Sequence, residues 1–240
     1  MTIYAIGDIH GDLAQLEQAL NRIEADGGAD APLVVLGDLV DRGPASRGVI
    51  ELLRAGVAAG RDWTVIRGNH DRMFLNFLTD GTIEDANIKS GLPWSHTRLG
   101  GQTTLASYGV TFDDARALAD IHAETAQAVP ADHLQFLQDQ PLFHEAGDLL
   151  FVHAGIRPGV PLADQQENDL IWIRDVFLDD PRQHPWLVVH GHTALEAPAH
   201  MGNRVNLDSG AAYGRALTSA VFEDGQIWTL GAEGRDALIP

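Results

Sequence analysis

The stretch Gly37–Gly43 reads G-D-L-V-D-R-G and directly follows the apolar run Leu33–Leu36. Four consecutive apolar residues that end at a glycine predict a short buried strand, and the two glycines permit tight turns. Two carboxylates and an arginine placed here are seldom structural filler, because ligands of open α/β sheets bind at the carboxyl ends of strands. The stretch therefore predicts an α/β fold with its functional site at the end of this strand.

The same order of strand, polar loop and helix occurs three times in the N-terminal third of the chain. A strand at the N-terminus runs into Asp8 and His10, and a strand over residues 63–66 runs into Asn69 and His70. Apolar residues at helical spacing follow each polar loop. This order predicts parallel strands with right-handed crossovers, so that the three polar loops lie at one edge of a sheet.

The C-terminal half contains further apolar runs that end in polar residues. A strand over residues 149–152 leads to His153, and one over residues 186–189 leads to His190 and His192. The tail alternates as antiparallel strands do, over residues 204–207, 217–222 and 227–230.

Residues 80–148 have less regular patterns. We expect helices near 97–107, 113–128 and 131–139, and a hairpin that joins 142–145 to 149–152. Tryptophans such as Trp94 are expected to pack in the core, and histidines away from the strand ends, such as His133, to face solvent. No repeat or linker divides the chain, which favours one domain over residues 1–240.

Composition excludes several kinds of partner. The 240 residues carry a formal charge of −18, which argues against a broad electrostatic contact with nucleic acid or an anionic membrane. The chain has no cysteine, so disulfides and zinc–thiolate sites are not available. No apolar run is long enough to span a bilayer and no charged leader precedes the first strand, so we expect a soluble cytoplasmic protein.

The polar residues at the strand ends share one chemistry. Aspartate, asparagine and histidine side chains, without a thiolate, suit borderline-hard cations such as Mn²⁺, Fe or Zn²⁺. Carboxylates among them can neutralise and bridge two neighbouring cations. A single such residue means little, but all of them follow a strand. We therefore expect two divalent metal ions, with Mn²⁺ ahead of Fe or Zn²⁺.

Five motifs resemble the metallophosphoesterase signature: G-D-I-H-G at 7–11, G-D-L-V-D-R-G at 37–43, G-N-H-D at 68–71, H-A-G at 153–155 and G-H-T at 191–193. The V-D-R-G extension is similar to the phosphoprotein-phosphatase branch, which includes the bacteriophage lambda phosphatase and small bacterial serine/threonine phosphatases. The resemblance implies an α/β fold of calcineurin-like type. In that fold a β-sandwich of two mixed sheets is flanked by helices, with a dinuclear metal site at the strand carboxyl ends.

The resemblance also implies roles for individual residues. The metal ligands would be Asp8 and His10 for the first ion, Asp38 as the bridge, and Asn69, His153 and His192 for the second. Strand alternation places His190 and His192 on one face and cannot choose between them, whereas the family pattern favours His192. His70 would be the general acid, with Asp41 orienting it and keeping it cationic. The substrate would contact Arg42, Arg174 and Tyr213.

The reaction implied is hydrolysis of a phosphomonoester by direct attack of a hydroxide bridging the two metals on phosphorus. The first expectation is a protein serine/threonine phosphatase that acts as a monomer on a phosphorylated protein or a small phosphoester. The alternative is a symmetrical diadenosine tetraphosphate hydrolase, which shares the dinuclear core. A metal-bound scaffold without turnover is a remote third possibility, because His70, Asp41 and Arg42 are all present. Substrate choice would depend on residues 80–148 and 155–170.

Overall fold

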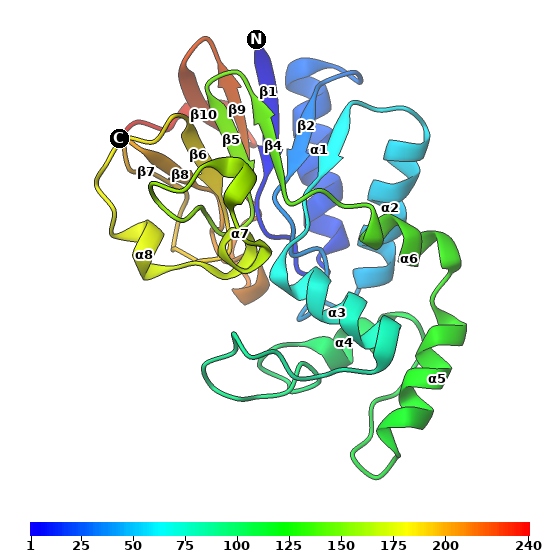
Figure 1. Ribbon diagram of the computed structural model, residues 1–240. Coiled ribbons are helices and arrows are strands. Elements are labelled where there is room, and N and C mark those ends of the chain that lie inside the picture. Colours follow the sequence, from blue (N-terminus) through cyan, green and yellow to red (C-terminus); the bar gives the residue numbers. More distant parts are fainter.

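Parallel strands and helices alternate through the N-terminal third, as the sequence predicts. In the computed structural model, which describes residues 1–240, β1 (Thr2–Ile6), β2 (Leu33–Val35) and β3 (Trp63–Val65) lie side by side and parallel (Figure 1). The helices that follow them are α1 (Leu13–Gly27), α2 (Ser46–Ala58) and α3 (Asn69–Asp80). The carboxylate of Asp12 accepts a hydrogen bond from the backbone N–H of Gln15 at 3.0 Å, which caps α1.

Two mixed sheets form the centre of the molecule. The six-stranded sheet has the order β11-β10-β9-β1-β2-β3, with β9 (Ser219–Glu223), β10 (Gln226–Gly231) and β11 (Gly234–Ala237) antiparallel. The five-stranded sheet has the order β4-β5-β6-β8-β7, with β4 (Phe143–Ala146), β5 (Leu149–Val152), β6 (Leu187–His190), β7 (Ala199–His200) and β8 (Arg204–Asn206). In this second sheet β5, β6 and β8 are parallel.

The expected antiparallel tail is wrong at its first strand. Residues 204–206 pair in parallel with β6 and belong to the five-stranded sheet, whereas β9 and β10 belong to the other sheet. The chain therefore crosses from one sheet to the other between β8 and β9. Alternation reports that a strand has a buried face, but it carries no information about which sheet the strand joins.

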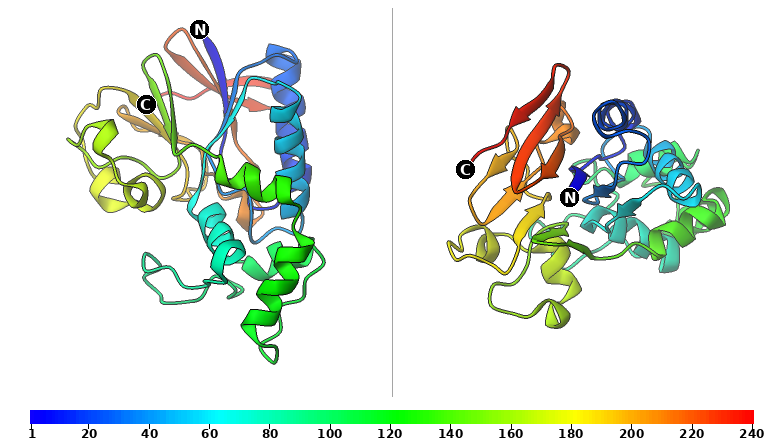
Figure 2. Two further views of the ribbon diagram at one scale, coloured as in Figure 1. Left: turned by 45° about the vertical axis from the view of Figure 1, so that its right-hand side comes forward. Right: turned by 90° about the horizontal axis from the view of Figure 1, so that it is seen from above.

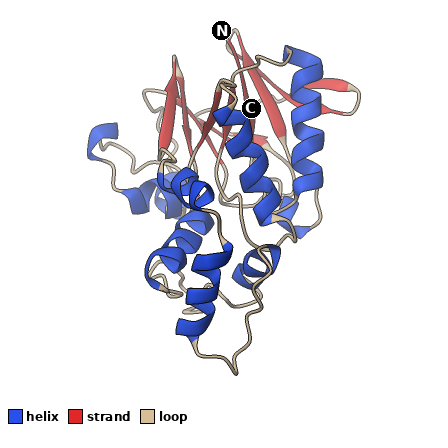
Figure 3. Ribbon diagram, turned by 90° about the vertical axis from the view of Figure 1, so that its right-hand side faces the viewer, coloured by secondary structure: helices blue, strands red, loops and turns tan.

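Side-chain alternation along the strands produces the layers. Ile3 and Ala5 of β1 pack between the two sheets, whereas Tyr4 and Ile6 pack towards the helices that cover the six-stranded sheet. In the second sheet Phe151 points into the space between the sheets. The opposite face of that sheet packs against α7 (Glu167–Trp172) and α8 (Asp175–Leu178). Figures 2 and 3 show the resulting arrangement of two sheets flanked by helices.

The region between β3 and β4 contains shorter helices than expected: α4 (Gly101–Ser107), α5 (Leu118–Ala128) and α6 (Ala131–Gln138). Helix α4 begins only at residue 101 because Gly100 has a left-handed backbone, with φ of 92°. Helix α5 begins late because the carboxylate of Asp113 accepts a hydrogen bond from the N–H of Ala115 and stabilises a turn there. None of the helices combines the length and the apolar character needed to cross a membrane.

His133 on α6 is buried, so the expectation that it faces solvent is wrong. Its ring lies between the hydroxyl of Tyr108, at 2.9 Å, and the carboxylate of Glu51, at 2.8 Å. Helix α6 packs against α2, which places this position inside the helical layer. Two polar partners distant in sequence satisfy both ring nitrogens, and local sequence could not reveal them.

Candidate functional site

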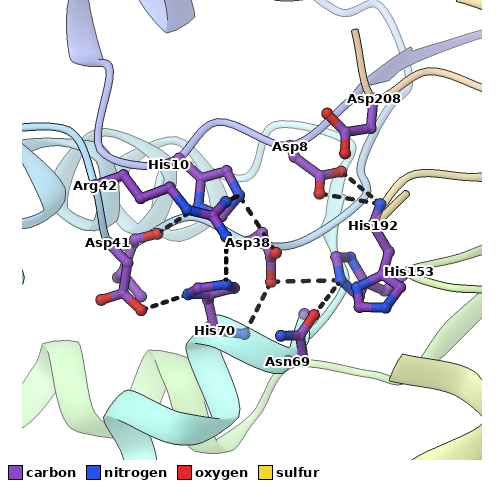
Figure 4. A network of polar contacts seen from close by, with 12 residues as sticks. Asp8, His10, Asp38, Asp41, Arg42, Asn69, His70, His153, His192 and Asp208 are labelled. Atoms are coloured by element: carbon purple, nitrogen blue, oxygen red, sulfur yellow. Dashed lines mark hydrogen bonds and ion pairs between the residues drawn. The ribbon is translucent and has the colours of Figure 1, made fainter. Parts of the chain in front are cut away.

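Strands of both sheets deliver polar side chains to one place. Asp8 and His10 follow β1, Asp38 follows β2, Asn69 and His70 begin α3, and His153 and His192 follow β5 and β6 (Figure 4). These residues all have less than a tenth of their surface exposed. The site therefore lies where the carboxyl ends of parallel strands from the two sheets meet.

The carboxylate of Asp38 lies at the centre of this group. Its Oδ2 atom is 3.5 Å from Nε2 of His10, and its Oδ1 atom is 3.4 Å from Nε2 of His153. Oδ1 also accepts a hydrogen bond from the backbone N–H of His70 at 2.9 Å. Two sets of potential metal ligands share this carboxylate, and in each set the ligand atoms lie within 4.8 Å of one another: His10, Asp38 and His70, and Asp38, His153 and His192.

The protonation states favour cation binding. Burial raises the pKa of Asp38, but His153, His70 and His10 outweigh burial and hold that pKa well below its usual range. Burial lowers the pKa of the His10, His153 and His192 imidazoles. Neutral imidazoles offer a lone pair to a metal, and an ionised aspartate offers its charge.

Asp8 and His192 show how a cation would complete the site. Burial and the neighbouring Asp208 raise the pKa of Asp8. The two carboxylates repel each other when both are ionised, and a cation between them would remove that repulsion. The Nε2 atom of His192 is buried and has no hydrogen-bond partner. A donor set of oxygen and nitrogen atoms without sulfur suits divalent cations. These residues fit divalent metal ions, and the donors alone do not select one metal.

The structure separates His190 from His192. His190 ends β6 and packs edge-on against Phe177, with the ring centroids 5.2 Å apart on the α8 side of the sheet. His192 lies beyond the strand with a left-handed backbone, φ of 65°, and its ring is 5.1 Å from that of His153. The expectation that both histidines share one face is wrong, because the chain turns at Gly191 and strand alternation no longer applies.

Gly191 permits a close approach that positions His192. The backbone N–H of His192 donates to the carboxylate of Asp8 at 3.0 Å and 3.2 Å. A Cβ atom on Gly191 would lie 1.9 Å from Oδ1 of Asp8, so any side chain here would push the two segments apart. This contact joins the loop after β6 to the loop after β1.

His70 and Asp41 form a hydrogen-bonded pair beside the metal ligands. Nδ1 of His70 lies 2.6 Å from Oδ2 of Asp41, and Asp41 is completely buried. The same carboxylate accepts hydrogen bonds from Nε1 of Trp94 at 2.8 Å and from Oγ1 of Thr104 at 2.6 Å. Asp41 is thus fixed on both oxygens, which fixes the orientation of the imidazole that contacts it.

Trp94 and Thr104 are the site residues that sequence reasoning missed. Trp94 is buried and stacks on Phe74 and Phe77, as expected of a core residue, but it also donates to Asp41. The one available signal was the indole N–H itself, because a buried tryptophan usually needs a hydrogen-bond partner. The partner, Asp41, lies 53 residues away in the sequence, so no local pattern could identify it.

Arg42, Arg174 and Tyr213, the residues expected to contact substrate, line one cavity of about 500 Å³. The same cavity is also lined by His10, Asp38, Asn69, His70 and His192. Nη2 of Arg42 lies 3.1 Å from Nε2 of His70, and the guanidinium lies 5.5 Å from the centre of the Tyr213 ring. Arg174 is exposed and donates to Oγ1 of Thr193 at 2.9 Å. Asp8, Asp41 and His153 lie behind the cavity wall, where they hold the lining residues.

Backbone strain concentrates at this site. His10, Asp38, Asp41, Arg42 and His192 all have positive φ, between 48° and 74°. The remaining non-glycine residue with positive φ is Asp224, in a hairpin turn. A non-glycine residue in this conformation costs on the order of 1–3 kcal/mol, and such strain clusters at functional sites.

The sequence profile of the calcineurin-like phosphoesterase family matches residues 1–220. The chain belongs to this family. Its two mixed sheets flanked by helices, with the candidate metal ligands between them, are the arrangement that the motifs implied. The calcineurin-like phosphoesterases thus include this chain, whereas the narrower phosphoprotein-phosphatase branch is not specifically supported.

Relatives of this calcineurin-like phosphoesterase carry more specific names. An asymmetrical bis(5'-nucleosyl)-tetraphosphatase, PrpE, of Bacillus thuringiensis (strain Al Hakam) is 24% identical over 91% of this chain and 89% of its own. A crystal structure named "putative diadenosine tetraphosphatase" is 26% identical, with a TM-score of 0.65, over 95% of this chain and 92% of its own. A cold-active protein-tyrosine phosphatase of a psychrophilic Shewanella species has a TM-score of 0.64 at 16% identity, covering 99% of this chain and 80% of its own, and shares the fold.

These relatives contradict the first functional expectation. A protein serine/threonine phosphatase is wrong as the main assignment, because the relatives that share 24–26% of their sequence with this chain over nine tenths of its length are named for dinucleoside tetraphosphates. The V-D-R-G extension is the reason for expecting a protein phosphatase, and the names of these relatives do not support that interpretation. Hydrolase chemistry of the phosphoesterase type is supported, as is a phosphoester substrate.

Proposed function

We propose that this protein is a hydrolase of dinucleoside polyphosphates such as diadenosine tetraphosphate. The observation that carries the proposal is the alignment, over about nine tenths of both chains, with relatives named as tetraphosphatases of this class. The cavity beside the candidate metal ligands supports it, since about 500 Å³ is far more space than one phosphate group needs.

Two divalent cations complete the proposed site. Asp8, His10 and Asp38 would hold the first, and Asp38, Asn69, His153 and His192 the second. Bound there, the cations would neutralise charge on the phosphate oxygens and make water a better nucleophile near neutral pH. Mn²⁺, Fe and Zn²⁺ all suit these donors, and Mn²⁺ is the first metal to test.

The residues of the chain itself orient the substrate and move a proton. Arg42, which lines the cavity beside His70, would bind two oxygens of the phosphate under attack, and Arg174 would bind a neighbouring oxygen. Nε2 of His70 would donate a proton to the oxygen of the departing group. Asp41 is a positioning residue, because it contacts the imidazole and lies behind the cavity wall.

The bond that is cleaved determines how much the proton matters. A nucleotide that leaves from a phosphoanhydride is a weak base, whereas an alkoxide is a strong one. His70 should therefore contribute less to hydrolysis of diadenosine tetraphosphate than to hydrolysis of an unactivated phosphomonoester.

A comparison of substrates tests the proposal. The metal-loaded enzyme should show a kcat/KM for diadenosine tetraphosphate at least tenfold above that for a phosphothreonine peptide or a phosphotyrosine peptide. Ion-exchange chromatography of the products then gives the position of attack: ATP with AMP for asymmetrical cleavage, two ADP for symmetrical cleavage. The relatives' name favours ATP with AMP. A preference for either phosphopeptide would refute the proposed function.

A further inference from the structure

A second cavity extends the candidate site. It measures about 490 Å³ and shares Arg42, Ser90, Leu99, Ala212 and Tyr213 with the cavity that contains the candidate metal ligands. Beyond these shared residues it is bounded by Leu92, Thr97 and Arg98. A continuous groove therefore leads from His70 and Asp38, past the ring of Tyr213, to the guanidinium of Arg98. A single phosphate occupies only its inner end.

The outer part of the groove is positively charged on an otherwise acidic protein. The chain carries 34 acidic and 16 basic residues, and its single lysine, Lys89, lines the first cavity. The second cavity is lined by two arginines and by no acidic residue. The first cavity is lined by three acidic residues, Asp38, Asp175 and Asp208, as well as three basic ones, so the cationic character increases away from the metal ligands.

Lys89 and Arg98 are free to bind an anion. Neither forms an ion pair, whereas most surface arginines of this chain do: Arg54, Arg61, Arg67, Arg72, Arg116, Arg157, Arg182 and Arg235. Both side chains are exposed. Because the protein has a net charge of −18, a single unpaired cation attracts anions only weakly over a distance. In direct contact, however, it forms a strong charge-assisted hydrogen bond with an anion.

The segment that carries these two cations is attached to the catalytic residues. It lies between α3 and α4 (Figure 1), and Asp85 near its start pairs with Arg72 of α3 at 2.9 Å. In its middle, Trp94 donates to Asp41. At its end, the carbonyl oxygen of Gly100 accepts a hydrogen bond from the N–H of Arg42 at 3.4 Å.

Gly100 makes the last of these attachments possible. Its φ is 92°, and a Cβ atom there would lie 2.2 Å from the backbone nitrogen of Arg42. The segment is therefore built against the same arginine that is proposed to bind the phosphate under attack. The segment is consequently anchored at Asp85, Trp94 and Gly100, on both sides of Lys89 and of Arg98.

We propose that Lys89 and Arg98 bind the phosphates of the substrate that lie beyond the phosphate under attack, and that they set the preference for a polyphosphate chain over a single phosphate ester. The proposal rests on the proposed function, since it assigns specificity residues for the same site. These two residues contact the departing part of the substrate and take no part in the bond cleavage.

The test uses Lys89→Gln, Arg98→Gln and the double variant in the metal-loaded enzyme. Each single variant should lower kcat/KM for diadenosine tetraphosphate by about 5- to 30-fold, mainly through KM, as expected for loss of one charge-assisted contact at an exposed position. The variants should bind orthophosphate as the wild type does in calorimetry, but bind the β,γ-methylene analogue of ATP more weakly by a similar factor. Arg47→Gln is the matched control, because Arg47 is an exposed cation that lines neither cavity.

The outcomes separate this proposal from the proposed function. If the wild type does not hydrolyse diadenosine tetraphosphate, the proposed function falls, and calorimetry with the two phosphate ligands still tests the role of the two cations. If the wild type does hydrolyse it and both variants match Arg47→Gln, the specificity role is refuted while the proposed function stands. If the variants bound orthophosphate and the ATP analogue more weakly by the same factor, the specificity role would also be refuted. That result would place Lys89 and Arg98 at the phosphate under attack.

Discussion

Replacing Trp94 by phenylalanine should separate the support of Asp41 from the packing of the core. The substitution removes the N–H that donates to Oδ2 of Asp41 at 2.8 Å, while an aromatic ring can still stack on Phe74 and Phe77. A hydrogen bond to a charged group contributes about 1.5–3 kcal/mol, and the smaller ring adds a cavity cost of about 1 kcal/mol. For a chain of this length we expect Tm to fall by roughly 5–15 °C.

The catalytic effect should be specific to the proton transfer. Thr104 still donates to the other oxygen of Asp41, so Asp41 should keep its contact with His70 but hold the imidazole less firmly. General acid catalysis is worth about 10²–10⁴-fold, and we expect a loss of roughly 3- to 30-fold in kcat on phenyl phosphate, with KM unchanged. On p-nitrophenyl phosphate, whose leaving group needs little protonation, the loss should be smaller.

Trp186→Phe is the control, since Trp186 packs beside β6 and donates no hydrogen bond to the site. It should lose some stability and retain kcat on both esters. Two results would refute the reasoning: the same kcat loss in both tryptophan variants, or the same loss on both esters in Trp94→Phe. Either would mean that the indole N–H supports the fold without positioning Asp41.

Three further outcomes are expected. His70→Ala should lower kcat by about 10²–10⁴-fold on phenyl phosphate and by less on diadenosine tetraphosphate; equal losses on the two would argue against a general acid. Asp38→Asn should reduce metal content, measured by elemental analysis, because both ligand sets share this carboxylate; a full complement of metal would sink the bridging role. The third outcome concerns Glu51, which accepts hydrogen bonds from Arg54 and His133. These hydrogen bonds lower the pKa of Glu51 from 4.5 to about 2, so the carboxyl group is ionised more readily in the folded state. The stabilisation that ionised Glu51 gives the folded state is therefore present above pH 4.5 and is lost as the pH falls towards 2. The Tm difference between wild type and Glu51→Gln should shrink over that pH window. A constant difference would contradict a stabilising role for ionised Glu51.

The sequence predicts the N-terminal half of the site well because that half is local. Each of Asp8, Asp38 and Asn69 follows its own strand within a few residues, and three repeats of one order dictate parallel strands with their loops together. Apolar runs and turn residues are enough to locate those loops. The parallel N-terminal strands and the edge where their polar loops meet follow from these patterns, whereas the arrangement of two mixed sheets is implied by the family resemblance.

Contacts between distant segments could not be predicted in the same way. The partners of Asp41 come from residues 94 and 104, in a region whose helices begin where a glycine or a turn permits rather than where apolar spacing starts. The assignment of residues 204–206 to the second sheet depends on which strand they pair with, and the choice between His190 and His192 depends on a turn at Gly191. The groove that we propose selects the substrate is lined by residues distant in sequence, and no motif describes it.

The placement of the ligands on two sheets also sets an order of events during synthesis. His10, Asp38 and His70 emerge from the ribosome within the first 70 residues, but His153 and His192 emerge much later. At about 5–20 residues per second, roughly 6–25 seconds separate translation of His70 from that of His192. During this interval the second candidate set, Asp38, His153 and His192, is incomplete. Completion of the proposed metal site is therefore coupled to completion of β6, so a chain terminated before residue 192 would lack one member of the candidate ligand set Asp38, His153 and His192.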